Sequence, residues 1–289
     1  MDKVINMDNK NSTSVLITSF LISILSIYCA LSGFLDENLY GNVVSTGVFK
    51  ISFMAGTISQ DFITIVSSVI MLVLIVLYRK QKDLRVMISI IGLLSFYFYA
   101  YGTYVISALY TSLYLVYMLI FTLSIFGMIM GISGFADDSV KKLHLPKWIR
   151  ISNIVFLSLI VVIFVGKWIS DLIPYTRSHT VPDFYAIYIL DLCVIMPFFV
   201  ALIYLLVKNT KFAYILLGVA LLKSATLILS VTIGSFIAPK YGTQDEASMI
   251  FIYSSVTVIS LFLFGAYCLK IKQRIDWTES ERETQNAST

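Results

Sequence analysis

This chain of 289 residues has the composition of a protein embedded in lipid. Hydrophobic residues make up 58% of it and charged residues 13%, whereas charged residues make up about 25% of an ordinary soluble domain. The formal net charge of +4 does not indicate a nucleic-acid partner, because the basic residues are distributed along the chain between long apolar runs.

The apolar runs predict an all-α fold. Backbone groups in the hydrocarbon core of a bilayer must be hydrogen-bonded within the protein, which leaves helices or closed barrels. Runs of about 20 residues favour helices, since a barrel strand shows only about ten residues of alternating polarity. We therefore expect a polytopic transmembrane helix bundle of about eight spans in one transmembrane domain, 14–270. The predicted spans are 14–35, 61–78, 86–106, 113–134, 151–173, 185–207, 212–237 and 249–269.

Residues 1–13 are predicted to be a short cytoplasmic segment. No small-x-small cleavage site follows the first apolar run, so this run is expected to stay as an anchor. The connection at 36–60 is longer than the others and contains Gly41, Gly47 and Gly56. Part of it can lie along the outer surface or dip into it, but a plain glycine-rich loop is the favoured interpretation.

The basic residues predict the orientation of the bundle, since Lys and Arg concentrate in cytoplasmic loops. The connections after spans two, four, six and eight each hold two to four of them. The opposite connections hold only Lys50, Arg177 and Lys240. Both chain ends are therefore expected in the cytoplasm (N-in/C-in), with 271–289 as a polar tail that lacks fixed structure from 276 onward.

Tyrosines recur at helical spacing on spans three and four. Tyr97, Tyr101 and Tyr104 lie on span three, and Tyr117 lies on span four, which a short turn makes an antiparallel neighbour. The outermost tyrosines are typical of an interfacial belt. The deeper ones form either the wall of a small-molecule pocket or ordinary helix packing.

Span four ends in Gly131-Ile132-Ser133-Gly134, the G-x-S-G form of intramembrane serine proteases of the rhomboid type. That chemistry needs a histidine at membrane depth. No predicted span contains one, because His144 and His179 fall in loops on opposite sides. Gly127 and Gly131 also form a small-residue pair suited to close helix packing, which is the favoured interpretation.

Five ionisable residues are predicted to lie at membrane depth or at its outer edge, where a charge is costly and usually faces a partner, a cavity or a transport path. They are Asp61, Lys167, Asp171, Asp191 and Lys223. One hypothesis is a polar cavity, open to the outside, that these residues line together with the tyrosines. The simpler hypothesis is that the three shallow residues reach the interface and the two deep residues form a structural ion pair.

Asp191 is predicted to be charged and paired with Lys223 or Lys167, because an unpaired charge at that depth is costly. Pro197 lies six residues after Asp191 and removes a backbone donor. We expect a kink in span six that opens room beside the acid.

No pattern for a cofactor or a metal is found. The three cysteines, Cys29, Cys193 and Cys268, all fall within predicted spans, which argues against a disulfide framework. Zinc-binding spacings, a phosphate-binding loop and a dinucleotide fingerprint are missing from the sequence. We therefore predict no catalytic, cofactor-binding or metal-binding residue.

Three short segments carry a resemblance. They are Gln60-Asp61, the stretch Tyr97-Phe98-Tyr99-Ala100-Tyr101 leading into Tyr104 and Tyr114, and Leu190-Asp191-Leu192 followed by Pro197. In these the chain is similar to an uncharacterised family of bacterial multi-spanning membrane proteins. The resemblance implies a bacterial cytoplasmic membrane, and it implies no activity or ligand.

Three functions compete. The leading hypothesis is a transporter or binding-type permease for a small polar or amphipathic solute, with an outward cavity that contains Asp191. The second is an accessory or assembly subunit of a membrane complex, with a filled centre and polar residues turned toward a protein partner. The third is an intramembrane enzyme on a lipid-linked or quinone-like substrate, with Asp191 as acid or base and Tyr101 as donor. The third lacks a nucleophile and a metal site.

Overall fold

The computed structural model describes residues 9–135, 140–141, 143–242 and 247–273. Within these residues, eight helices are long and apolar enough to cross a membrane, which confirms the expected all-α, eight-span fold. The predicted unstructured tail at 276–289 lies outside the described residues. So does most of the amino-terminal segment predicted to precede the first span.

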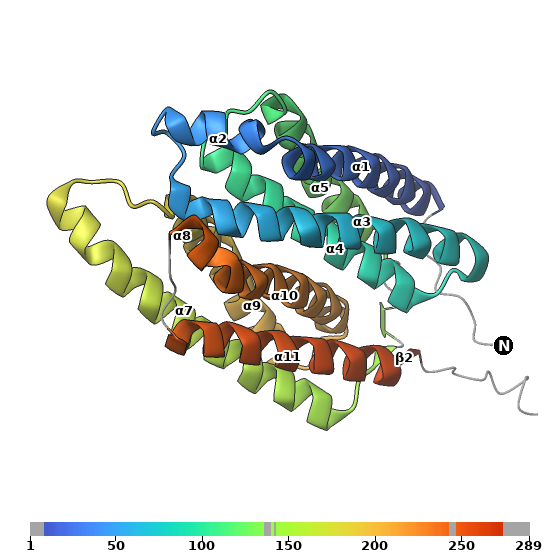
Figure 1. Cartoon of the computed structure of the whole chain (residues 1–289). Helices are drawn as coiled ribbons and strands as arrows, with labels where there is room; N and C mark the ends of the chain where they lie inside the picture. The colour runs from blue at the N-terminus through green and yellow to red at the C-terminus, as the bar shows by residue number, and fades with distance from the viewer. Residues whose placement is uncertain (1–8, 136–139, 142, 243–246, 274–289) are drawn as a thin grey trace, which may run out of the picture.

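The helices follow one another as antiparallel rods (Figure 1). The first four spans are α1 (Asn9–Leu35), α3 (Met54–Gln81), α4 (Leu84–Ile106) and α5 (Tyr114–Ser133). The fifth is α7 (Lys147–Ser178), and the sixth consists of α8 (Tyr185–Leu190), η2 (Asp191–Ile195) and α9 (Met196–Val207). The last two are α10 (Phe212–Ile237), which continues into η3 (Ala238–Tyr241), and α11 (Ala247–Lys270).

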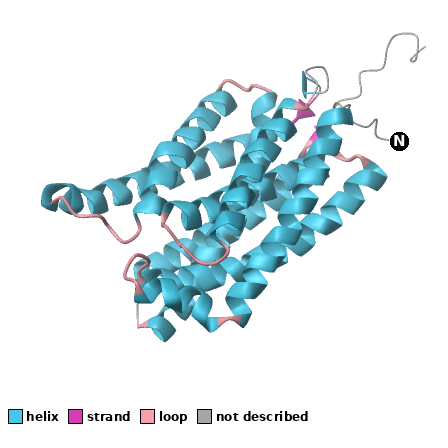
Figure 2. Ribbon diagram, turned by 90° about the horizontal axis from the view of Figure 1, so that it is seen from above, coloured by secondary structure: helices cyan, strands magenta, loops and turns pink. Residues whose placement is uncertain are grey.

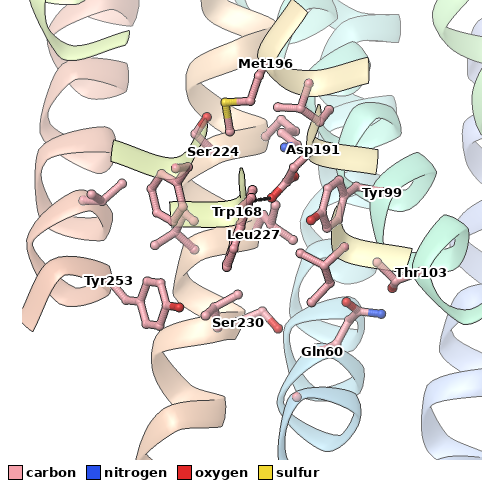
Figure 3. A pocket seen from close by; sticks show the side chains of 18 of the residues that line it. Gln60, Tyr99, Thr103, Trp168, Asp191, Met196, Ser224, Leu227, Ser230 and Tyr253 are labelled. Carbon is pink, nitrogen blue, oxygen red and sulfur yellow. Dashed lines mark hydrogen bonds between the residues drawn. The ribbon is translucent and has the colours of Figure 1, made fainter. Parts of the chain in front are cut away.

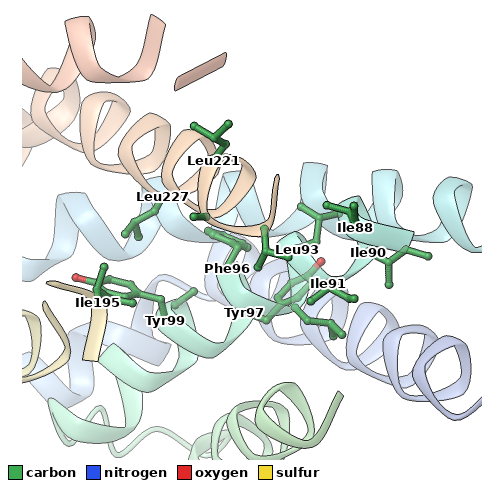
Figure 4. Packing of buried hydrophobic residues seen from close by; sticks show 14 of the residues in the cluster. Ile88, Ile90, Ile91, Leu93, Phe96, Tyr97, Tyr99, Ile195, Leu221 and Leu227 are labelled. Carbon is green, nitrogen blue, oxygen red and sulfur yellow. The ribbon is translucent and has the colours of Figure 1, made fainter. Parts of the chain in front are cut away.

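The spans α1, α3, α4, α5 and α10 pack tightly against one another, and α4 and α10 are the most buried of all eight. Close approach of these two helices depends on glycine. A side chain at Gly92 would press against Leu222, and one at Gly218 would collide with Ile88 and Tyr267. Small residues at such contacts let helix backbones approach in a membrane, where van der Waals packing drives association. Buried side chains such as Ile88 and Phe96 lie at the contact (Figure 4).

The other three spans are arranged around one face of α10. α11 packs against α10, α7 packs against α11 and α9, and α8 and α9 return to α4 and α10. α7 is 32 residues long, or roughly 48 Å at about 1.5 Å per residue, so it extends beyond a hydrocarbon core of about 30 Å. These contacts close a ring of helices around a central space.

The segment between α1 and α3 corrects a prediction. Instead of a plain glycine-rich loop, it forms α2 (Glu37–Ser45) and η1 (Ile51–Phe53). Asp36 caps α2 by accepting a hydrogen bond from the Asn38 backbone N–H at 3.0 Å, as N-cap residues do. Of the glycines there, only Gly47 has a positive φ (76°) and serves as a turn residue.

The second span also begins earlier than predicted. α3 starts at Met54 and not at 61, so Asp61 lies two turns inside the helix. The intervening polar side chains lowered the apparent hydrophobicity, but they are buried against protein and not against lipid. Thr57, Ser59 and Gln60 are all less than a tenth exposed.

Two short strands join distant parts of the chain. β1 (Leu143–His144) pairs in antiparallel register with β2 (Lys272–Gln273), so the segment after α5 is tied to the segment after α11 (Figure 2). The strands lie at the end of the bundle where α1 begins (Figure 1). The basic residues predict that this end is cytoplasmic, and we refer to the opposite end as the outer end.

The G-x-S-G match is a packing feature in this structure. A Cβ at Gly131 would lie 2.7 Å from Ile91, and one at Gly127 would lie 3.0 Å from Leu94. Ser133 lies at the exposed end of α5, where its hydroxyl donates to the Met130 carbonyl at 3.4 Å. α5 therefore uses its glycines to approach α4, as the packing interpretation expects.

Candidate functional site

A cavity of about 160 Å³ occupies the space inside the ring of helices, in the outer half of the bundle (Figure 3). Its wall is mostly apolar and aromatic. The rings that line it belong to Phe49, Phe53, Tyr99, Tyr104, Phe164, Trp168, Phe199 and Tyr253. The polar side chains that line it are Thr57, Gln60, Thr103, Ser107, Asp191, Lys223, Ser224 and Ser230.

Asp191 lies on the wall of this cavity and is 7% exposed. The indole Nε1–H of Trp168 on α7 donates a hydrogen bond to its Oδ2 at 2.8 Å (Figure 3). The Tyr99 hydroxyl on α4 faces the same carboxyl. These neutral donors orient the carboxyl group without neutralising its charge.

A break in the regular helix places Asp191 there. η2 is a π-helical turn in which the Met196 N–H donates to the Asp191 carbonyl, five residues back. Pro197 follows and has no N–H to give, so the regular pattern cannot simply continue through this turn. Such π-turns recur at functional sites, and the kink expected from Pro197 stays a prediction.

Lys223 approaches the cavity from α10 and is 4% exposed. Its Nζ lies 4.4 Å from the centre of the Tyr99 ring and 5.9 Å from that of Phe199, which are cation–π distances. Within the described residues its ammonium group makes no hydrogen bond and no salt bridge. Its three N–H donors therefore find no hydrogen-bond acceptor within the described part of the chain.

Asp191 and Lys223 therefore share a cavity without direct contact. The salt bridges among the described residues join Arg85 to Asp83 and Lys167 to Asp171, and none joins the two deep charges. They still interact through the space between them. The hypothesis of a simple structural ion pair does not describe this arrangement.

Lys167 is not the partner of Asp191. Its Nζ lies 3.0 Å from Oδ2 of Asp171, one turn along α7, and both side chains are about one third exposed. Successive helix residues point about 100° apart, so Trp168 faces the cavity while its neighbour Lys167 does not. Neither Lys167 nor Asp171 lines the cavity.

Asp61 belongs to a separate network behind the cavity wall. It is 2% exposed and accepts hydrogen bonds from the hydroxyls of Tyr40 at 2.6 Å and Tyr104 at 2.9 Å. Gly33 makes room for it, since a Cβ there would collide with both Asp61 and Tyr40. Burial, and then the adjacent Asp61 carboxyl, raise the pKa of Tyr40 well above its usual range, so this phenol stays a neutral donor.

The tyrosines expected on one wall are divided between packing and the cavity. Tyr104 lines the cavity, whereas Tyr97, Tyr101 and Tyr117 do not. The Tyr97 hydroxyl bonds to Ser68 at 2.7 Å, and the ring of Tyr117 lies 5.8 Å from that of Tyr101 and 5.3 Å from that of Tyr104. These rings form a buried cluster that supports the Asp61 network.

Two segments far apart in sequence meet at the outer end of the cavity, and we call their contact the aromatic cover. The Phe53 ring lies 5.1 Å from that of Phe49 and 4.8 Å from that of Phe184, just before α8. The Ser52 hydroxyl donates to Asp183 at 3.2 Å. Together these contacts join the start of α3 to the start of α8.

Trp168 and Tyr99 are the main residues that the sequence did not single out. A usable signal was present, because cavity residues repeat at intervals of three or four from each deep charge. On η2 and α9 the set is Asp191, Ile195 and Phe199, and on α10 it is Lys223, Leu227 and Ser230. No such rule reveals Trp168, since its relation to Asp191 depends on how α7 packs against α9.

In the described part of the chain, no group of three His, Cys, Asp or Glu side chains is arranged to hold a metal ion. Large apolar side chains such as Val73, Val162 and Phe262 are more than half exposed on the outer surfaces of the spans, where they meet the bilayer.

No protein-family model, curated protein or solved structure matches the chain. The protein is therefore established as a multi-pass helical membrane protein.

Proposed function

We propose that this protein binds a small amphipathic solute in the cavity and carries it across the membrane. The observation that carries the proposal is that two buried ionisable side chains, Asp191 and Lys223, face the same cavity without touching. Asp191 and Lys223 are each less than a tenth exposed. Ionisable groups inside a membrane are costly and are typical of substrate and ion paths.

The cavity has the size and surface of a ligand site. An apolar cavity of about 150 Å³ is large enough to hold a benzene molecule. This cavity of about 160 Å³ combines apolar rings with a few converging polar groups, the usual composition of a small-molecule pocket. A packing defect of that size would not need two charges on its wall.

The arrangement of helices supports movement of a bound solute. On the inner side of the cavity, the contact of α4 with α10 is tightly filled around Gly92 and Gly218. α7 packs mainly against α9 and α11, and its Trp168 also contacts Asp191 of η2 and Tyr188 of α8. A shift of α7 with α8 and α9 against the α4–α10 pair can open the inner side while the aromatic cover closes the outer side, which is the rocking motion of many transporters.

Cysteine accessibility tests this function. Ser230→Cys is placed in a chain whose native Cys29, Cys193 and Cys268 are replaced by Ala, and vesicles of both orientations are treated with the impermeant reagent 2-sulfonatoethyl methanethiosulfonate. Because Ser230 lines the cavity, we expect labelling from both faces. The control is Ser26→Cys, which is fully buried on α1 and should not react.

Labelling of position 230 from one face only would indicate a binding protein without transport. Protection from both faces would contradict the proposal and favour the accessory-subunit hypothesis, in which the centre of the bundle is filled. If the reagent labels the control cysteine at position 26, the bundle is not folded in the vesicles. Such a preparation is discarded before comparison.

A further inference from the structure

The charges of the cavity specify the kind of solute that fits it. Asp191 and Lys223 together make a wall that is electrically neutral but strongly polarised. A solute with a net charge would leave this buried site with a net charge, which is unfavourable in a low-dielectric environment. A solute that is neutral overall, with a positive and a negative end, preserves the balance and gives each wall charge a partner.

Lys223 indicates where the negatively charged end of the solute binds. Its ammonium is buried, has no acceptor among the described residues, and rests on the Tyr99 ring. The neighbouring Ser224 also lines the cavity, and its hydroxyl likewise makes no hydrogen bond within the described residues. A carboxylate has the lone pairs to accept from both groups, and charge-assisted bonds of this kind are the strong ones.

Asp191 indicates where the positively charged end of the solute binds. Its Oδ2 accepts from Trp168, and a carboxylate has capacity for about four hydrogen bonds in total. The rings of Trp168 and Tyr99 lie beside it, and aromatic faces attract ammonium groups. A primary ammonium can therefore bind the free lone pairs of Asp191.

The remaining wall selects an apolar side chain. Phe164, Phe199 and Leu227 line the rest of the cavity. A cavity of about 160 Å³ is comparable with one that holds a benzene molecule, so it suits a small solute better than a lipid, whose acyl chains would have to stay outside. We infer that the ligand is a free apolar α-amino acid, with its carboxylate on Lys223 and Ser224 and its ammonium on Asp191.

This inference rests on the proposed function, and Trp168 provides its test. In the Trp148→Phe, Trp277→Phe variant of the full-length protein, Trp168 is the single remaining indole. Its emission is measured in detergent during titration with L-leucine, 4-methylpentanoate, 3-methylbutylamine and dioctanoyl phosphatidylethanolamine. Leucine should bind at least tenfold more tightly than either half-molecule, since each lacks one charge-assisted contact.

Two variants and a control test which residue binds the carboxylate of leucine and which binds its ammonium group. Lys223→Met should remove the advantage of leucine over 3-methylbutylamine, and Asp191→Asn should remove its advantage over 4-methylpentanoate. Lys240→Met, which changes a basic residue outside the cavity, should leave all affinities unchanged. Where a variant does not fold, the comparison of leucine with its half-molecules in the parent protein decides by itself.

Equal affinity for 4-methylpentanoate and leucine would overturn the inference in favour of an anionic solute. Tighter binding of the phosphatidylethanolamine would overturn it in favour of a lipid, and binding of none of the four probes would also reject it. Each of these results is compatible with labelling of Ser230→Cys from both faces. Failure of the inference is therefore distinguishable from failure of the proposed function.

Discussion

At the scale of single residues, Asp61 and Asp191 are both buried acids, but the groups that surround them differ. Asp61 is enclosed by two phenol hydroxyls and has no cation beside it within the described residues. Asp191 has an indole N–H and a lysine across the cavity. Asp61 does not line the cavity, whereas Asp191 lies on its wall, where a ligand has room to bind. This difference makes Asp191 the functional candidate and Asp61 a structural one.

The two charges of the cavity should be coupled in stability. Asp191→Asn leaves Lys223 as the only charge of the cavity and should destabilise the protein, and the added Lys223→Met substitution should recover part of the loss. A double-mutant cycle on unfolding free energies should give a coupling of about 0.5–3 kcal/mol. Lys167→Met, whose lysine pairs with Asp171, should show no coupling with Asp191→Asn. Coupling to Lys167 in place of Lys223 would contradict the structure.

The Asp61 network should depend on each of its donors. Tyr40→Phe removes the hydroxyl that binds Oδ2 of Asp61 and leaves a buried acceptor unsatisfied. We expect a loss of about 1–3 kcal/mol in the free energy of unfolding, measured by titration with a denaturing detergent. Tyr204→Phe is the matched control, because Tyr204 is 61% exposed. A loss of the same size at position 204 would show that the assay does not report this network.

At the scale of elements, the sequence predicted the spans well and the segment before α3 poorly, for a single physical reason. Hydropathy measures preference for lipid, and it finds helices whose neighbours are lipid or apolar side chains. Gln60 is polar but buried, and its Nε2 donates to the Ala100 carbonyl at 2.9 Å. A hydropathy profile treats each helix separately, so it does not register that a polar side chain is hydrogen-bonded to a neighbouring helix. It therefore places the end of the span at that residue.

The contact of α5 with α4 should fail when its glycines are enlarged. Gly131→Leu would force side-chain atoms into Ile91, which lies 2.7 Å from the position of a Cβ. The folded yield in detergent should therefore fall, because overpacking of a filled contact is destabilising. Gly265→Leu on α11 is the control, since no atom lies within 4 Å of a Cβ there. Equal yields for the two variants would argue against close packing of α5.

At the scale of the whole molecule, the candidate site forms between α3, α4 and α10 on one side and α7, η2, α9 and α11 on the other. The sequence identified Asp191 and Lys223 as deep charges, which is why they were candidates. It left Lys167 as an alternative partner of Asp191, because span assignments give depth and not direction. Which side of a helix faces the cavity is fixed by contacts between spans, such as that of α7 with α9, and these are not encoded locally.

The cover at the outer end should control access to the cavity. Ser52→Cys with Asp183→Cys, in the background without native cysteines, should form a disulfide, because the wild-type side chains meet at 3.2 Å. Exchange of leucine in proteoliposomes should then stop under oxidation and return after reduction. The single Ser52→Cys variant should exchange leucine under both conditions. Undiminished exchange by the cross-linked protein would show that solutes do not pass this cover.

The central position of α10 has a consequence for the order in which the protein is made. α10 fills the space beside α4, yet more than 100 residues separate the ends of the two helices along the chain. At a synthesis rate of about 5–20 residues per second, α4 waits roughly 5–25 s in the membrane before its partner emerges. During that interval the surface of α4 around Gly92, which Leu222 of α10 later covers, is exposed to lipid or to quality-control proteins. Amino-acid changes on this face of α4 can therefore lower the cellular amount of the protein even when the finished fold tolerates them.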